Sequence, residues 1–240
     1  MQDINITIVC DNNPYKEGLE TGWGFSCLIC GAEKTILFDT GPGGSLLGNM
    51  EKMAIEPSEI DDVVLSHIHQ DHTGGLESFL EKNSDVTVYL PDSFPTKLKD
   101  SVRRYGTKVV DVEQPTNICK NVYSGGQSGK WIKEQSLIIH TERGLILITG
   151  CAHPGIVKII EEAKEYLKED ILLVMGGFHL EWAIGGKIEK IVSSFKQLGV
   201  RYTGPCHCTG EKGRGMFKKH FERNYINIGA GKVIKLADLQ

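Results

Sequence analysis

The sequence predicts an α/β fold of four layers, in which two mixed β-sheets lie face to face between two layers of helices. Short apolar strands in hairpin-like pairs occur in both halves of the 240-residue chain, as two sheets require. Amphipathic helices follow strands in each half and can cover the outer faces of the sheets. The chain shows no internal repeat and no low-complexity linker, so residues 1–240 are expected to form one domain.

Each expected helix or strand follows from the spacing of its apolar residues and from the turn-forming residues at its ends. Apolar runs bounded by turn residues predict strands at 4–10, 24–30, 35–38, 62–65, 86–90, 108–112, 136–140, 145–149, 171–175 and 200–203, with two more near Tyr225 and Val233. Helical periodicity predicts helices at 45–53, 76–82, 96–105, 156–168, 187–198 and 215–221, with a helical turn at 57–60. Residues 114–131 are rich in glycine and show little periodicity, so we expect a loop there.

Composition and charge indicate which kinds of molecule the protein is not expected to bind. The net charge is −4, whereas a nucleic-acid-binding protein normally presents a basic face, so we expect no nucleic-acid partner. No apolar run approaches the roughly 18 residues of a membrane span. The first residues lack the basic and apolar regions of a signal peptide, so we expect a cytoplasmic protein without a membrane partner.

The seven cysteines do not predict a disulfide framework, because their number is odd and their spacing irregular. Cys27 and Cys30 have the spacing of a redox or zinc motif, but they fall in an expected buried strand, where cysteine behaves as a small apolar residue. A four-cysteine zinc site needs a second such pair, and Cys206 and Cys208 have the wrong spacing for it.

The most informative motif is His67-x-His69-x-Asp71-His72, which directly follows an apolar strand. Imidazole and carboxylate together suit zinc, iron or manganese. On an extended strand end, His67 and His69 point to the same side and can reach one ion. The turn into the next helix carries Asp71 and His72 toward a neighbouring position. Histidines that merely cap a strand and a helix would leave polar groups crowded and unpaired, so we favour a metal site.

This motif resembles the signature of the metallo-β-lactamase superfamily, and the order of the other elements agrees over nearly the whole chain. The resemblance implies the four-layer fold and adds two ligands from later segments. His153, in Thr149-Gly150-Cys151-Ala152-His153-Pro154, would join His67 and His69, and His207 would join Asp71 and His72 at a second ion. It also implies that Asp39 holds the ligand loop by hydrogen bonds; a simple turn aspartate is the alternative.

One departure from the family pattern concerns the segment Gly176-Gly177-Phe178-His179. The superfamily usually places a metal-bridging aspartate after this strand, and this sequence has His179 there instead. His179 is therefore expected to be a ligand, a substrate contact or a proton donor, and otherwise a strand-end histidine bonded to the backbone. Further motifs, including Trp23-Gly24-Phe25-Ser26, resemble the branch similar to the dihydropterin-ribofuranosyl-aminobenzene-phosphate synthase of methanopterin biosynthesis.

The resemblance implies an enzyme that holds two divalent metal ions, zinc first, with manganese, iron or magnesium as alternatives. We expect a hydrolase, or a related lyase or synthase, that uses activated water on a small phosphorylated or ester substrate. Asp71 would orient the water, and His179 would donate a proton. A di-iron redox protein and a catalytically silent metal-binding module are the alternatives. The oligomeric state stays open, a homo-oligomer included.

Overall fold

The computed structural model describes residues 4–239. The first sheet has seven strands in the described chain, in the order β13 (Val233–Lys235), β1 (Asn5–Cys10), β2 (Ser26–Cys30), β3 (Ile36–Phe38), β4 (Asp62–Val64), β5 (Thr87–Pro91) and β6 (Lys108–Val112). The second has six, in the order β12 (Tyr202–Cys206), β11 (Ile171–Gly177), β10 (Gly144–Thr149), β9 (Leu137–Thr141), β8 (Val122–Ser124) and β7 (Thr116–Cys119). Both sheets contain parallel and antiparallel pairs, as predicted.

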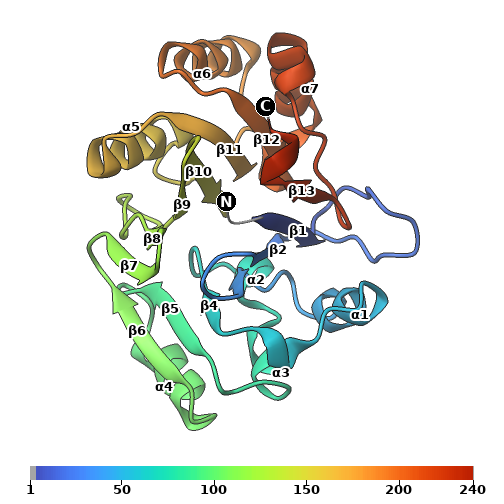
Figure 1. The fold of residues 1–240 in the computed structure, drawn as a ribbon, viewed down its shortest axis with the longest axis vertical. Helices are drawn as coiled ribbons and strands as arrows, with labels where there is room; N and C mark the ends of the chain where they lie inside the picture. Colours follow the sequence, from blue (N-terminus) through green and yellow to red (C-terminus); the bar gives the residue numbers. More distant parts are fainter. Residues whose placement is uncertain (1–3, 240) are drawn as a thin grey trace.

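Helices cover the outer face of each sheet (Figure 1). Beside the first sheet lie α1 (Ser45–Lys52), α3 (Leu76–Leu80) and α4 (Thr96–Arg104). Beside the second lie α5 (Ile156–Leu167), α6 (Gly185–Gln197) and α7 (Gly210–Phe221). The short α2 (Gln70–Thr73) carries part of the histidine motif, and 3-10 turns occur at Pro57–Glu59, His207–Thr209, Glu222–Asn224 and Leu236–Asp238. The predicted order of helix, sheet, sheet and helix is confirmed.

The core has three apolar layers because strand side chains alternate between faces. In β10, Ile146 and Ile148 pack between the two sheets, whereas Leu145 and Leu147 pack toward the helices of the second half. A third cluster fills the space between the first sheet and its helices. Cys27 of β2 is fully buried in the layer between the sheets, as expected, and all seven cysteines carry free thiols.

Three local predictions were wrong or incomplete. Residues 116–124 form the hairpin of β7 and β8, because the turn Lys120-Asn121 places Asn121 in the left-handed region (φ 64°) and allows antiparallel pairing. The strand predicted near Tyr225 is only a single bridge to Thr203. Helix α7 begins at Gly210, five residues before the predicted start at 215; glycines in its first turns conceal the helical pattern in the sequence.

The parallel strands direct their carboxyl ends toward one edge shared by the two sheets. Strand β3 pairs in parallel with β4, and β10, β11 and β12 are parallel to one another. The loops after β4 and β10 meet, since a Cβ on Gly150 would lie 2.1 Å from Ser66 Oγ. Loops at such carboxyl ends commonly hold ligands in α/β proteins.

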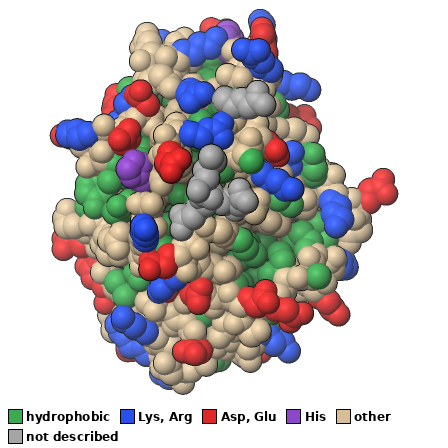
Figure 2. Space-filling model, viewed as in Figure 1, with side chains coloured by type: hydrophobic (Ala, Val, Ile, Leu, Met, Phe, Trp, Pro, Cys, Tyr) green, Lys and Arg blue, Asp and Glu red, His purple; other side chains and the backbone are tan. Residues whose placement is uncertain are grey.

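On the face drawn in Figure 2, basic and acidic side chains are interspersed over both halves of the molecule. Within residues 4–239, every helix is too short or too polar to cross a membrane.

Candidate metal centre

The first group of potential ligands consists of His67, His69 and His153. His67 and His69 lie in the loop between β4 and α2, and His153 lies in the loop after β10. Their donor nitrogens all lie within 4.8 Å of one another, and His67 Nε2 is 3.1 Å from His69 Nδ1. His67 is fully buried, while His69 and His153 are partly exposed. These are the three residues that the sequence grouped at one position.

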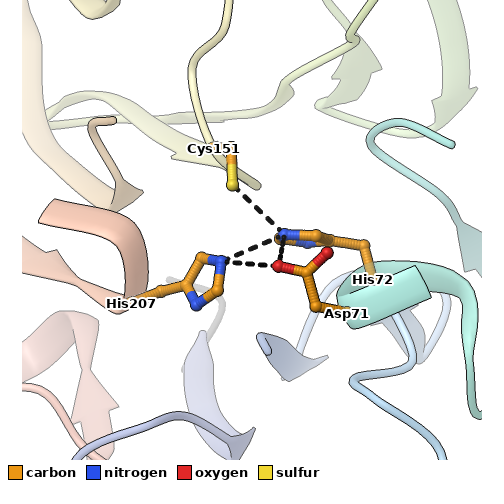
Figure 3. Close-up of side chains that lie close together, drawn as sticks. All are labelled: Asp71, His72, Cys151 and His207. Carbon is orange, nitrogen blue, oxygen red and sulfur yellow. Dashed lines mark hydrogen bonds and ion pairs between the residues drawn. The ribbon is translucent and has the colours of Figure 1, made fainter. Parts of the chain in front are cut away.

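The second group consists of Asp71, His72 and His207, joined by Cys151 (Figure 3). Asp71 and His72 come from α2, and His207 follows β12. His72 Nε2 lies 3.2 Å from His207 Nε2, and Asp71 Oδ2 lies 3.2 Å from His207 Nε2 and 3.5 Å from His72 Nε2. The structure therefore brings together the three residues that the sequence grouped at the second position. It adds Cys151, whose Sγ is 3.3 Å from His72 Nε2.

Asp39 lies at the end of β3 and joins the two ligand loops. It is fully buried and accepts hydrogen bonds from Ser66 N (2.6 Å), Ser66 Oγ (2.7 Å) and His72 Nδ1 (2.7 Å). This is the contact that the family resemblance implied. Burial raises the pKa of Asp39, while His72 and Ser66 act to lower it.

Three further hydrogen bonds fix the orientation of the imidazoles of His67, His207 and His153. Ser66 Oγ donates to Asp39, so it accepts from His67 Nδ1 at 2.9 Å. Asn12 Oδ1 accepts from His207 Nδ1 at 2.8 Å, and Glu134 Oε2 accepts from His153 Nδ1 at 2.9 Å. With Nδ1 protonated in each case, the Nε2 lone pairs of these histidines and of His72 are left for the site.

Glu134 is the most extensively bonded of the residues that the sequence analysis missed. Its two oxygens accept from the backbone N–H groups of Cys151 (2.9 Å), Ala152 (2.8 Å) and His153 (2.8 Å), and from the His153 ring. Burial raises the pKa of Glu134, but the His153 hydrogen bond and nearby His67 outweigh it, and the pKa is lowered. A fully buried, ionised carboxylate thus holds the loop that carries Cys151 and His153.

The electrostatics of the site favour positive charge at the second group. Burial lowers the pKa of His72, yet Asp39 and Asp71 outweigh it and raise the pKa to about 10. Burial raises the pKa of Asp71, but hydrogen bonds from His207 and His72 hold it well below its usual range. Burial, with a contribution from His72, lowers the pKa of His67 to about 2, so His67 is a neutral donor at ordinary pH.

His179 lies beside the two groups rather than within either. Its ring is 4.6 Å from that of His153, and its side chain is near the thiols of Cys151 and Cys208. A hydrogen bond with Cys208 raises the pKa of His179, against the effect of burial. His179 is exposed at the rim, which is compatible with contact to a substrate and does not place it among the buried donors.

Backbone strain is concentrated in the site. Asp39 (φ 57°), Ala152 (φ 59°), His179 (φ 53°) and His207 (φ 46°) are non-glycine residues in the left-handed region. This conformation costs free energy for residues with a Cβ and persists only where surrounding contacts enforce it. Here the four positions turn the chain after β3, β10, β11 and β12, and three of them, Asp39, His179 and His207, carry side chains at or beside the ligand groups.

The donor set fits divalent metal ions by geometry. Two nitrogens bound tetrahedrally to one ion at about 2.0–2.1 Å lie about 3.3 Å apart. The closest donor pairs in the two groups are 3.1 Å and 3.2 Å apart. Unprotonated nitrogens that face each other at this distance inside the protein need a shared cation or proton between them. The three nearby carboxylates of Asp39, Asp71 and Glu134 supply compensating negative charge.

The first prediction concerns Asp39. In Asp39→Asn, an amide NH₂ replaces one carboxylate oxygen and cannot accept a hydrogen bond. At least one buried donor that bonds to Asp39 therefore loses its acceptor, at a cost of about 1–3 kcal/mol. We expect the melting temperature to fall by at least about 2 °C in metal-free protein. Calorimetry with chelator present measures this, and Asp100→Asn on the surface of α4 is the control. Equal stability of Asp39→Asn and the parent would contradict the role assigned to Asp39.

Comparisons with known proteins agree with this geometry. The family model described as the metallo-beta-lactamase superfamily matches residues 24–165. The chain is 30% identical to the 7,8-dihydropterin-6-methyl-4-(beta-D-ribofuranosyl)-aminobenzene-5'-phosphate synthase of Methanocaldococcus jannaschii, over 95% of each chain. It is also 30% identical to an uncharacterized protein of the same organism, over 95% of this chain and 99% of that one.

Among solved structures, Tm1679, a metal-dependent hydrolase of the β-lactamase superfamily, is 32% identical, with a TM-score of 0.81 over 96% of this chain and 98% of that one. These relatives support an enzyme, and the fold implies binding of divalent metal. The family match, the extent of the similarity and the shared fold show that the chain belongs to the metallo-β-lactamase superfamily.

Proposed function

We propose that this protein is a metal-dependent hydrolase that holds two divalent ions, zinc first, and uses water to cleave a small phosphorylated or ester substrate. The observation that carries the proposal is the pair of convergent ligand groups, His67, His69 and His153, and Asp71, His72 and His207. When bound, two such ions would lower the pKa of water and polarise the carbonyl or phosphoryl oxygen of the substrate.

Two side chains, those of Asp71 and His179, would act on the attacking water and on the leaving group. The side chain of Asp71 is 19% exposed and its lowered pKa keeps it ionised, so it can accept a hydrogen bond from the attacking water and orient it. His179 stands at the rim with a pKa that a hydrogen bond with Cys208 raises, which favours the protonated form that would donate to the leaving group.

The surroundings of His179 support a phosphorylated substrate. Lys187 is close enough to act on the pKa of His179, and Lys212 lies beside Gly185 at the start of α6. Two ammonium groups near a helix N-terminus favour an anion. Trp182 and Ile184, on the loop that follows His179, are 92% and 76% exposed, and offer apolar contact to a substrate body. The phosphate named for the synthase of M. jannaschii makes phosphorylated compounds the first class to test.

The test combines metal analysis with a substrate panel. Protein purified and reloaded with zinc or manganese is expected to hold about two ions per chain and to hydrolyse at least one class among phosphomonoesters, phosphodiesters, thioesters and lactones. Turnover must disappear with chelator and return with metal. Two bound ions without turnover of any class would favour a silent metal-binding module. Bound iron with oxygen reactivity would favour the redox alternative, and absence of metal would refute the proposal.

A second prediction concerns His179. Glutamine keeps much of the size of histidine but has no titratable proton, so His179→Gln is expected to lower kcat by about 10²–10⁴-fold with unchanged metal content. His220→Gln, on the exposed side of α7, is the matched control and should keep full activity. A fall in metal content in His179→Gln would make His179 a ligand, and an unchanged kcat would remove it from the catalytic scheme.

A further inference from the structure

We infer that Cys151 supplies a sulfur ligand to the ion at the second position, which completes a set of two imidazoles, one carboxylate and one thiolate. The inference rests on the proposed metal centre and adds a donor to it. Cys151 forms no disulfide, and its thiol lies 3.3 Å from His72 Nε2 while also interacting with the thiol of Cys208. Figure 3 shows its sulfur directed at the imidazole of His72, with His207 and Asp71 beside the same nitrogen.

Distances support a common ion. Cys151 Sγ lies 3.3 Å from His72 Nε2, and the donor atoms of Cys151, Asp71, His72 and His207 all lie within 4.8 Å of one another. His72 Nδ1 is already committed to Asp39, so Nε2 is the atom that faces the sulfur. Four donors of this kind match the usual tetrahedral coordination of zinc, for which thiolate is a preferred ligand, and the three-histidine group keeps a fourth position open for water.

The backbone holds Cys151 in this place. Its N–H donates to Glu134 Oε1 at 2.9 Å, and its side chain is buried at 3% exposure. Gly177 of β11 allows the close approach, because a Cβ there would lie 2.3 Å from Gly150 O and 3.2 Å from Cys151 Cα. A larger residue at 177 would displace the loop and carry the thiol away from His72.

Among residues 4–239, the second ligand group contains one carboxylate. In the described site, Asp71 is the carboxylate in the second group, since Asp39 is bonded to Ser66 and His72, and Glu134 to residues 151–153. The loop after β11 places His179 beside the site, and the acid of that loop, Glu181, belongs to neither ligand group. On binding, the Cys151 S–H bond breaks, the proton leaves to solvent, and the sulfur lone pair forms the bond to the ion.

A titration with cobalt(II) tests whether Cys151 binds the second ion, and its result does not depend on catalytic activity. Metal-free protein titrated with cobalt is expected to develop a thiolate-to-cobalt charge-transfer absorption as the second ion binds. Cys151→Ser, close in size to the parent residue, should lose this band and bind the second ion at least about tenfold more weakly. Cys208→Ser and Cys206→Ser, which remove neighbouring buried thiols, should keep it.

X-ray absorption of the zinc-loaded parent protein gives a measurement that needs no variant. One sulfur scatterer per two zinc ions, at about 2.3 Å, is expected. Two bound ions with only nitrogen and oxygen neighbours would overturn the inference and leave the proposed hydrolase intact. A cobalt band that survives in Cys151→Ser, or vanishes in Cys208→Ser instead, would also overturn it. Failure to bind any ion would overturn both proposals.

Discussion

His69→Ala is expected to lower kcat/KM by about a thousandfold or more and to reduce the bound metal from about two ions to about one. A metal ion contributes several kcal/mol to stabilisation of a transition state, and each 1.36 kcal/mol is a factor of ten in rate. His69 is partly exposed and lies beside His67 and His153, so its removal opens the first ligand group without emptying the core.

Metal analysis and steady-state kinetics, measured on the same preparation, check this result. His140→Ala is the matched control, because His140 lies on β9 near Glu169 and outside both ligand groups. It should keep full metal content and rate. Retention of two ions and full activity in His69→Ala would show that the first ligand group is assigned wrongly.

Glu134→Ala is expected to destabilise the metal-free protein by about 3–5 kcal/mol, which is the usual cost of removing one partner of a buried charged network. The truncation leaves three backbone N–H groups and the His153 ring without their acceptor. For a chain of this size the melting temperature should fall by about 6–20 °C. Glu142→Ala, at an exposed turn, should change it by less than about 2 °C.

The destabilisation by Glu134→Ala also has a predicted pH dependence. The pKa of Glu134 is lowered in the folded state, so its stabilisation is fully present above the unfolded pKa of about 4.3 and is lost as pH falls toward the folded value. Denaturant unfolding at pH 7 and at pH 3 should therefore show a smaller difference between parent and variant at the lower pH. A constant difference would contradict a role as a buried anion.

Local pattern predicted the layers of the fold, and the resemblance to the metallo-β-lactamase superfamily predicted how the histidines are grouped. Apolar runs predicted the strands, and helical periodicity predicted the helices that cover them. In the structure, the ends of parallel strands bring His67, His153 and His207 to one edge. Glu134 and Asn12 could not be found this way. Their partners lie 19 and 195 positions away in the sequence. Glu134 falls in a loop, and Asn12 lies in a segment whose residues are typical of a turn.

Cys151 was missed for a different reason. It stands two residues before His153 at a strand end, which is a spacing that allows a second ligand, but a buried cysteine is most often an apolar core residue. The distance to His72, 79 positions earlier in the chain, distinguishes the two roles, and only the folded structure provides it.

Each ligand group draws donors from both halves of the molecule. His72 and His207, which face each other, are 135 positions apart and belong to loops of different sheets. An ion held by both is bound only while the two sheets stay packed, so its binding free energy resists their separation. Once a site is nearly saturated, each tenfold rise in free ion adds about 1.4 kcal/mol per ion to the free energy of unfolding. The concentration of free metal around this protein would therefore tune its free energy of unfolding as well as its proposed chemistry.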